Sequence, residues 1–210
     1  MEGQYCRLVP IGPEHADDLY AAFMQAPDGR AFTYLFEEPP DSLAAMQDRI
    51  TRMVADTTTL HHAVIDRNTG RAVGHAALMR IDPTHGVIEV GHITMSPLMQ
   101  RTRIATEMLA LFMTRVFDEL GYRRFEWKCD SLNGPSRRAA ERFGFQFEGI
   151  FRQAVVYKQR NRDTAWYSIL DQEWPRLRTA YAAWLDPSNF DANGLQRQRL
   201  QAFMADRTSD

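Results

Sequence analysis

VIEVGHITMSPLMQRTRIATEMLALFMTRVFDELGYRRFEWKC, residues 87–129, is the stretch that decides the fold predicted for this chain. Its first nine residues alternate between apolar and polar side chains, which predicts a strand over residues 87–95. Ser96-Pro97 ends this strand, and apolar residues at helical spacing then predict a helix that Gly121 stops. Residues 123–129 form a second strand. Because a helix joins the two strands, we expect them to be parallel neighbours.

The sequence before this stretch predicts an antiparallel meander. From His61 the pattern has period two, and strands at residues 63–65 and 72–81 precede the strand at 87–95. The turn clusters at residues 66–70 and 82–86 are short enough to join these strands directly. Three successive strands joined by tight turns make a meander.

Two helices and a loop come earlier still. Residues 6–11 predict a first strand, and a helix from Pro13 to about Ala26 follows it. Asp41 or Ser42 caps a second helix, whose apolar face contains Leu43, Met46, Ile50 and Val54. The loop between these helices, residues 27–40, carries Phe32, Tyr34, Leu35 and Phe36, which either enter the core or wall a pocket.

The sequence after residue 129 predicts four further elements: a short helix at 133–143 that Gly144 ends, a hairpin of strands at 145–157 and 164–170, and a helix at 174–185. The fold class is therefore α/β (α+β), a mixed and mostly antiparallel central sheet flanked by helices. We expect one domain over residues 1–186 and an extension over 187–210. The extension is either a short amphipathic helix, on its own chain or on a partner subunit, or disordered at its end.

Composition limits the function. The chain has 210 residues, 44% of them hydrophobic, which suits one domain with a short appendage. Its 25 basic and 27 acidic side chains give a net charge of -2, which argues against a general nucleic-acid binder. No apolar run approaches the roughly 18 residues that span a bilayer, and the first residues lack the pattern of a signal peptide. We expect a cytoplasmic protein that binds neither nucleic acid nor membrane.

Cysteine, histidine and lysine are used sparingly. Cys6 and Cys129 have no metal-ligand spacing, and the six histidines form no HxxxH or HExxH pattern. We therefore expect free thiols and no metal site. Only Lys128 and Lys158 are lysines, so arginine supplies 23 of the 25 basic side chains.

The turn between the strand and the helix of the opening stretch is a candidate site. Residues 99–106 run straight into the helix, so unpaired backbone N–H groups and the positive end of the helix dipole point outward. Such a turn binds phosphate oxygens, and Arg101 and Arg103 add fixed positive charge. An ordinary helix start with two solvated arginines is the alternative.

A second segment, DSLNGPSRRAAERFGF at residues 130–145, combines a strand end with a capped short helix. Together the two segments resemble the acyl-CoA-binding half of the GCN5-related N-acetyltransferases (GNAT), in particular the branch that acetylates ribosomal-protein N-termini. The resemblance covers about residues 5–175. It implies the GNAT fold, acetyl-CoA as co-substrate and acyl transfer to an amine.

The resemblance assigns the family's pyrophosphate turn, Q/R-x-x-G-x-G/A, to residues 100–105. Arg103 stands where the family has glycine, so we expect the backbone to approach the diphosphate at negative φ, and the guanidinium is able to grip a phosphate itself. The residues that the resemblance assigns to acetyl-CoA are Ile93, Thr94, Met95, Gln100, Arg101, Thr102, Arg103, Ile104, Ala105, Thr106, Asn133, Ser136, Arg138 and Arg142.

The short helix carries the family's second motif. Asn133 matches the asparagine that reaches the pantetheine arm, whereas Ala140 stands where relatives often have the tyrosine that protonates the thiolate. Ser136 matches a serine typical of the ribosomal-protein branch and becomes the candidate for a hydrogen bond to the CoA sulfur. A polar residue in the first helical turn is the alternative. Arg137, Arg138 and Arg142 either hold the 3′-phosphate or are solvated.

Attack on the thioester requires a neutral amine and therefore a base. Glu89 lies where relatives often have a glutamate on this strand and is the first candidate, with a surface glutamate as the alternative. The stretch between Glu148 and Asp163 lacks the carboxylate that some members have, which leaves Glu89, Glu148 or no enzymatic base. His92 is a second candidate because imidazole suits proton transfer near neutral pH.

The oxyanion needs a donor of its own. We expect a backbone N–H near residues 93–95 to hold it, where Gly91 permits a bulge. No cysteine lies where a covalent acyl relay is expected, so transfer is direct.

The sequence therefore predicts an acetyl-CoA-dependent N-acetyltransferase acting on a protein N-terminus or a small-molecule amine. Acetyl-CoA lies between the strand ending at Met95 and the strand ending at Cys129, and the acceptor enters from the side of residues 27–40 and the last hairpin. The alternatives are a transferase for a bulkier acyl group and a non-catalytic acyl-CoA-binding sensor. A homodimer formed through the tail or the last strand is a further expectation.

Overall fold

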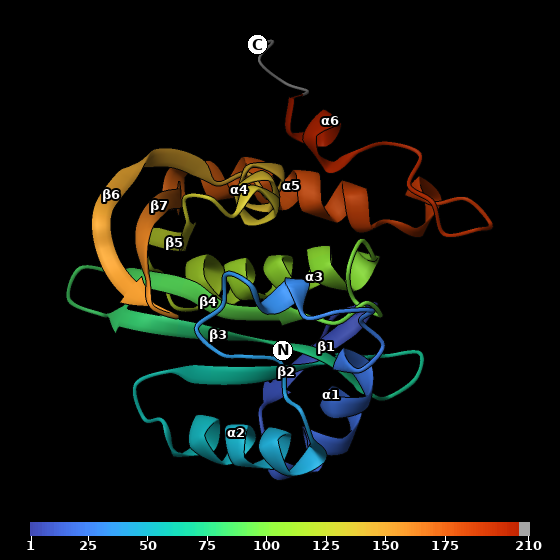
Figure 1. Cartoon of the computed structure of the whole chain (residues 1–210). Helices are drawn as coiled ribbons and strands as arrows, with labels where there is room; N and C mark the ends of the chain where they lie inside the picture. The colour runs from blue at the N-terminus through green and yellow to red at the C-terminus, as the bar shows by residue number, and fades with distance from the viewer. Residues whose placement is uncertain (206–210) are drawn as a thin grey trace.

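The computed structural model describes residues 1–205 and contains one seven-stranded sheet with helices on both faces (Figure 1). The strand order is β1-β2-β3-β4-β5-β7-β6, and within the described residues β4 and β5 form the one parallel pair. This confirms the predicted meander and crossover. The strands are β1 Cys6–Pro10, β2 Leu60–Asp66, β3 Ala72–Asp82, β4 Val87–Met95, β5 Arg124–Asp130, β6 Gln146–Tyr157 and β7 Arg160–Leu170.

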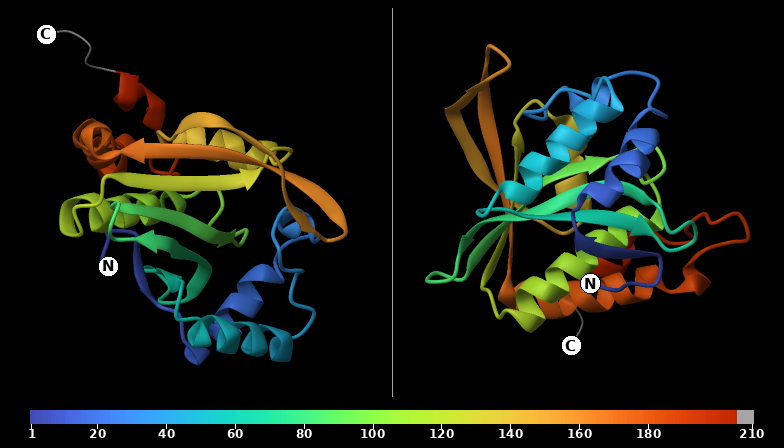
Figure 2. Two further views of the ribbon diagram at one scale, coloured as in Figure 1. Left: turned by 90° about the vertical axis from the view of Figure 1, so that its left-hand side faces the viewer. Right: turned by 90° about the horizontal axis from the view of Figure 1, so that it is seen from below.

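The helices divide between the two faces of the sheet. One layer, of α1 and α2, packs on β1–β3, and a second layer, of α3 and α5, packs on the opposite face (Figures 1 and 2). The helices are α1 Ala16–Phe23, α2 Leu43–Ala55, α3 Arg103–Met113, α4 Gly134–Arg142, α5 Trp174–Leu185 and α6 Leu200–Ala205. Short 3-10 turns occupy Pro13–His15, Arg30–Phe32, Asp171–Glu173 and Pro187–Asn189.

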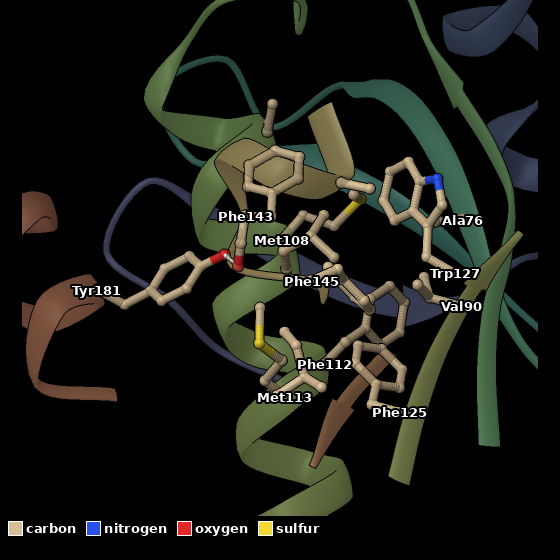
Figure 3. Packing of buried hydrophobic residues seen from close by; sticks show 14 of the residues in the cluster. Ala76, Val90, Met108, Phe112, Met113, Phe125, Trp127, Phe143, Phe145 and Tyr181 are labelled. Carbon is tan, nitrogen blue, oxygen red and sulfur yellow. Dashed lines mark hydrogen bonds between the residues drawn. The ribbon is translucent and has the colours of Figure 1, made fainter. Parts of the chain in front are cut away.

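Aromatic side chains fill the space between β4, β5 and α3 (Figure 3). Phe125 and Trp127 come from alternate positions of β5 and lie in one cluster with Phe112 of α3. Tyr181 of α5 is buried as well and donates a hydrogen bond of 3.0 Å to the carbonyl oxygen of Phe143. Each such buried ring stabilises the fold by about 2–3 kcal/mol. The core therefore holds α3 and the end of α4 rigidly behind the parallel pair.

Two helices differ from the predicted pattern. α3 ends at Met113, and a π-helical turn over Thr114–Glu119 replaces the rest of the predicted helix. The wider turn lets two successive residues, Val116 and Phe117, face the core, whereas Leu120, at the end of the predicted helix, is 48% exposed. In α2, Met53 rather than Val54 is buried, because positions i, i+4 and i+7 from Met46 form the inner face.

The last hairpin is tighter than predicted. β7 begins at Arg160, four residues before the predicted start, because Lys158 and Gln159 alone connect it to β6. Both residues have positive φ, at 48° and 58°, which matches the twist of a two-residue hairpin turn. Neither residue type is a typical turn former, so the sequence did not mark this turn.

The loop and the tail complete the chain. Phe32 enters the core and is 5% exposed, whereas Phe36 is 54% exposed and packs on Tyr157, so the core alternative holds for Phe32 but not for Phe36. In the tail, α6 packs against α5 and buries Leu200. The predicted disorder at the extreme end falls on residues 206–210, outside the described residues.

Candidate active site

The parallel strands β4 and β5 separate half-way along β4. Their backbones pair from Val87 to Val90 on β4 and from Arg124 to Trp127 on β5. Beyond this point β4 continues to Met95, next to β3, and β5 continues to Asp130, next to β7. The sheet is therefore split at the place where the sequence predicted the co-substrate.

A β-bulge in β4 follows the last pair. The register with β3 shifts between Gly91 and Thr94, and His92 has a φ of 50°. The predicted bulge is present, but the positive φ lies at His92 and not at Gly91. Gly91 instead provides space, since a Cβ there would stand 2.4 Å from the sulfur of Met79. Because of the extra residue, the side chain of Ile93 lies on the core face of the sheet, and that of His92 lies on the opposite face, together with Glu89.

Glu89 is buried on the sheet face opposite α3. Its Oε2 lies 2.8 Å from the ammonium of Lys128 and 3.3 Å from the guanidinium of Arg80. Its Oε1 lies toward Gly91, 3.7 Å from the position of a Cβ on that residue. With 5% exposure, Glu89 is not a surface glutamate.

Lys128 is a site residue that the sequence analysis missed. Its Nζ lies 2.7 Å from Glu126 as well as near Glu89, and it stands 3.8 Å above the ring of Trp166. In β5 the charged residues Arg124, Glu126, Lys128 and Asp130 alternate with apolar ones. Charges at every second position of a strand expected in the core are the signal that could have found them.

Glu148, the other carboxylate considered, belongs to a different ion pair. Both of its oxygens contact the guanidinium of Arg124, and Ser168 donates to Oε1 at 2.6 Å. The pairing with Arg124 lowers the pKa of Glu148. This carboxylate is fully occupied by its partners.

The turn before α3 is held against the end of β4. The side chain of Gln100 donates to the carbonyl of Met95 at 2.9 Å, and the Thr102 hydroxyl donates to that of Met99 at 2.7 Å. Thr102 is the N-cap residue, and no side chain of the described residues caps the helix. The first N–H groups of α3 therefore keep the capacity to bind an anion, and Arg101 lies exposed beside them.

Arg103 adopts the negative φ that was predicted, because it is the first residue of α3. Its guanidinium contacts two aromatic rings, with centroid distances of 4.7 Å to Tyr5 and 4.5 Å to Phe190. The side chain that replaces the family's glycine therefore joins the turn to the N-terminal segment and to the tail.

The N-terminus of α4 holds Asn133 and Ser136 together. Asn133 is the N-cap, and its Oδ1 accepts the Ser136 N–H at 3.1 Å. The Ser136 hydroxyl accepts from the indole of Trp127 at 3.0 Å. Burial raises the pKa of Cys129, and Ser136 opposes this shift. Ser136 is thus tied to β5 through Trp127.

The arginines of α4 separate in the structure. Arg142 donates to the hydroxyl of buried Thr106 at 3.1 Å and lies over the rings of Phe143 and Trp184. Arg137 donates to the Tyr167 hydroxyl at 3.0 Å, whereas Arg138 is exposed. Of the three, Arg138 is the exposed one, and its guanidinium lies near Gly134 at the start of the helix.

Glu89 and Ser136 lie on opposite faces of the sheet. Ser136 contacts Trp127, whereas Glu89 contacts Lys128, the next residue of the same strand. Successive residues of a strand point to opposite faces. A group that contacts both must therefore pass between β4 and β5.

The loop over residues 27–40 and the tip of the last hairpin touch each other on the Glu89 face (Figure 2). Lys158 donates to the carbonyls of Phe32 and Glu37 at 3.0 and 3.1 Å, and Arg160 donates to that of Thr33 at 2.8 Å. Two segments 120 or more residues apart, which were expected to line one side, are thus joined.

Asp130 fastens the hairpin to the end of β5. The Tyr157 hydroxyl donates a hydrogen bond of 2.7 Å to the carboxylate of Asp130, and Asp130 is only 2% exposed. Burial and this carboxylate raise the pKa of Tyr157 to about 12. The phenol therefore stays protonated at neutral pH.

The described residues contain no group of three histidine, cysteine, aspartate or glutamate side chains that could hold a metal ion. Within the same part of the chain, no helix combines the length and hydrophobicity that crossing a membrane requires.

Comparison with known proteins identifies the family. A model of the acetyltransferase (GNAT) domain matches residues 6–146. The chain belongs to the GNAT acetyltransferase family. The match spans the split strands, the α3 turn and α4, so the expectation drawn from the two segments is confirmed.

Two kinds of relative support this GNAT assignment. The Bacillus subtilis (strain 168) protein named Putative ribosomal N-acetyltransferase YdaF is 25% identical over 168 residues, which cover 78% of this chain and 90% of that protein. A crystal structure of a GCN5-related N-acetyltransferase from Brucella melitensis is 53% identical, with a TM-score of 0.94 over 97% of this chain and 92% of that one. A probable GNAT acetyltransferase from Chromobacterium violaceum ATCC 12472 is 40% identical, with a TM-score of 0.77 over 83% and 87% of the two chains.

The GNAT assignment makes the protein an acyltransferase, and acetyltransferases of this family use acetyl-CoA. The likeness to YdaF agrees with the resemblance to the ribosomal-protein branch.

Proposed function

We propose that this GNAT acetyltransferase moves the acetyl group of acetyl-CoA to a primary amine, on a protein N-terminus or a small molecule, by direct attack of the amine. The observation that carries the proposal is the end of β4–β5 pairing at Val90 and Trp127 while both strands continue. A thioester held in this split is accessible to groups from both faces of the sheet.

In this proposal the nucleotide end of acetyl-CoA lies on the α3 side. The backbone N–H groups over residues 100–106 bind the diphosphate, supported by the absence of a side-chain cap on α3 in the described residues. Arg101 and Arg138 are exposed and supply charge for the phosphates. Arg142 and Thr106 contribute by fixing α4 to α3 around the cofactor.

Asn133 and Ser136 meet the pantetheine and its sulfur. The Ser136 hydroxyl accepts from the Trp127 indole, so its own proton is available to donate to the departing CoA thiolate. The oxyanion on the thioester carbonyl lies near the backbone N–H groups of residues 93–95, where β4 has left β5.

Glu89 is the proposed base in the attack step. Lys128 and Arg80 hold one carboxylate oxygen, while the other lies toward Gly91, where β4 leaves β5. A carboxylate fixed in this way can accept a proton directly or through one water.

We also propose that residues 1–186 form the catalytic domain and residues 187–210 an extension of it. In this proposal the protein is a homodimer and is located in the cytoplasm. The exposed apolar side chains Phe151 and Val156 on the edge strand β6 support a contact there. Sedimentation velocity of the full chain tests this, and a monomer at all concentrations contradicts it.

The activity test uses the full chain with acetyl-CoA and a panel of peptides with free N-termini, polyamines and amino acids. Thiol release that depends on an amine, with the acetylated product identified by mass, is the expected result. Faster release from propionyl- or butyryl-CoA identifies a transferase for bulkier groups. Tight CoA binding without turnover on any amine overturns the proposal in favour of a sensor.

A further inference from the structure

A group of imidazoles and carboxylates beneath the loop over residues 27–40 is not used by the steps above. It contains His61 of β2, His75 of β3 and His92 of β4, together with Glu37 of the loop and Asp56 after α2. These groups face the same side of the sheet as Glu89, because the bulge turns His92 to that side. Arg49 of α2 and Lys158 of the hairpin are charged groups close to them.

His92 and Glu37 form the outermost pair of this group. The Nδ1 of His92 lies 3.4 Å from Oε1 of Glu37, and the two side chains are 27% and 33% exposed. The contact with His92 lowers the pKa of Glu37 to about 2, so this carboxylate stays ionised at any pH at which the protein works. Lys158 holds the backbone of Glu37, so the carboxylate is fixed from the hairpin side.

The other two imidazoles are buried behind this pair. The rings of His61 and His92 lie 5.1 Å apart, and the strand position between them is occupied by Ala77, which is small enough to let them meet. Burial lowers the pKa of both His61 and His75, the latter to about 4, so both stay neutral near pH 7. His92 alone of the three combines partial exposure with a carboxylate inside 3.5 Å.

His92 also stands at the right place on β4. It lies two residues beyond Val90, the last residue paired with β5, and three residues beyond Glu89 on the same face. An acceptor that approaches the split from the side of the loop and the hairpin therefore passes this imidazole.

The chemistry of amine acetylation requires more than one proton acceptor. A primary amine is largely an ammonium ion at pH 7 and must lose one proton before its nitrogen has a free electron pair. It loses a second proton after the C–N bond has formed and the C–S bond has broken, while the leaving thiolate regains one. One proton per turnover must therefore leave the site.

We propose that His92, held by Glu37, takes up the proton that an ammonium acceptor loses before attack and passes it to solvent. An N–H bond of the ammonium breaks and an N–H bond forms at Nε2 of His92, and the freed electron pair then attacks the thioester carbonyl. Glu89 remains the acceptor of the second proton. The step rests on the proposed function, because it requires an amine acceptor.

His92→Asn in the full chain tests this step. Asparagine tolerates the positive φ at this position and keeps a polar contact for Glu37, but it cannot take up a proton. The probe is the most active amine of the panel, and kcat/KM is measured from pH 6.5 to one unit above the pKa of that amine. We expect about a 100-fold loss at pH 7 that shrinks to within about 3-fold at the upper pH, where the amine is already neutral.

His62→Asn is the matched control, because His62 is also a strand histidine but packs on Phe112 on the α3 face. It should leave the pH profile unchanged. Glu37→Gln should weaken activity in the same pH-dependent way as His92→Asn, since Glu37 is the positioning residue. A loss of equal size at every pH, or none, overturns the inference while the wild type still acetylates amines. A wild type inactive on every amine overturns the proposed function itself.

Discussion

The ammonium of Lys128 lies 2.8 Å from the carboxylate of Glu89 and joins β5 to β4 at the point where their backbone pairing ends. The same ammonium lies 2.7 Å from Glu126, which stands directly opposite Glu89 in the parallel register. One buried cation thus separates two carboxylates that would otherwise face each other. The candidate base depends on this cation for its position.

Lys128→Met should destabilise the fold strongly, because it leaves two buried carboxylates without their shared partner. We expect a loss of about 3 kcal/mol in the free energy of unfolding, measured by urea titration. Arg80→Met is the control, since Arg80 contacts the same carboxylate from an exposed position and should cost less than about 1 kcal/mol. Similar losses for both variants would contradict the role given to Lys128.

Glu89→Gln should reduce amine-dependent thiol release by at least about 100-fold, because the amide cannot accept the proton of the attacking amine. Acetyl-CoA affinity, measured by calorimetry, should change little. Glu126→Gln is the matched variant: it removes the other carboxylate beside Lys128 but leaves Glu89 in place. Equal activity losses in both variants would show that the charge balance, rather than the base, matters.

Arg103→Ala should lower the free energy of unfolding by about 1–2 kcal/mol, because it removes the cation that contacts both Tyr5 and Phe190. Chemical denaturation measures this change. If the stability stays constant and acetyl-CoA binding weakens instead, the guanidinium serves the phosphates and not the rings.

The free energy of unfolding should decrease as the pH is lowered from 6.5 to 4, because of His75. Burial lowers the pKa of this imidazole to about 4, whereas a histidine in the unfolded chain titrates near 6.5. The unfolded chain therefore binds more protons in this window, so the free energy of unfolding decreases as the pH drops, by up to roughly 3 kcal/mol.

Urea titrations at pH 7 and pH 5 test this dependence. His75→Gln should flatten it, whereas the change of exposed His85 to Gln should not. An unchanged slope in the His75 variant would assign the acid sensitivity to other groups, such as His61 and His62, whose pKa values are also lowered.

Much of the fold was predictable because the spacing of apolar side chains in strands and helices can be recognised within a short stretch of sequence. The alternation in β2–β4 and the helical spacing after Ser96 are read within short windows, and the parallel order of β4 and β5 then follows from the crossover. The π-helical turn at Thr114 was not predictable in this way, since packing of Phe117 on Trp174, far along the chain, favours it. The two-residue turn at Lys158 depends likewise on contacts with a distant loop.

Part of the candidate site was likewise predictable from the sequence, and part depends on contacts between distant segments. Glu89, Ser136 and the α3 turn could be named because a resemblance locates them by position in the sequence. Position and charge grouped Arg103 and Arg142 with the phosphates, but Phe190 of the tail lies against Arg103, and Trp184 of α5 lies against Arg142. The partners Lys128 and Glu37 come from other strands and loops, so only the register of the folded sheet brings them to Glu89 and His92.

The use of arginine in place of lysine has a chemical consequence for an enzyme that handles a reactive thioester. Lys128 and Lys158, the two lysines of the chain, are both engaged: the first by two carboxylates and the second by two carbonyls and Glu38. Guanidinium groups stay protonated and are poor nucleophiles toward acyl donors. The enzyme therefore offers its own donor no free lysine side chain, and it should resist acetylating itself during turnover.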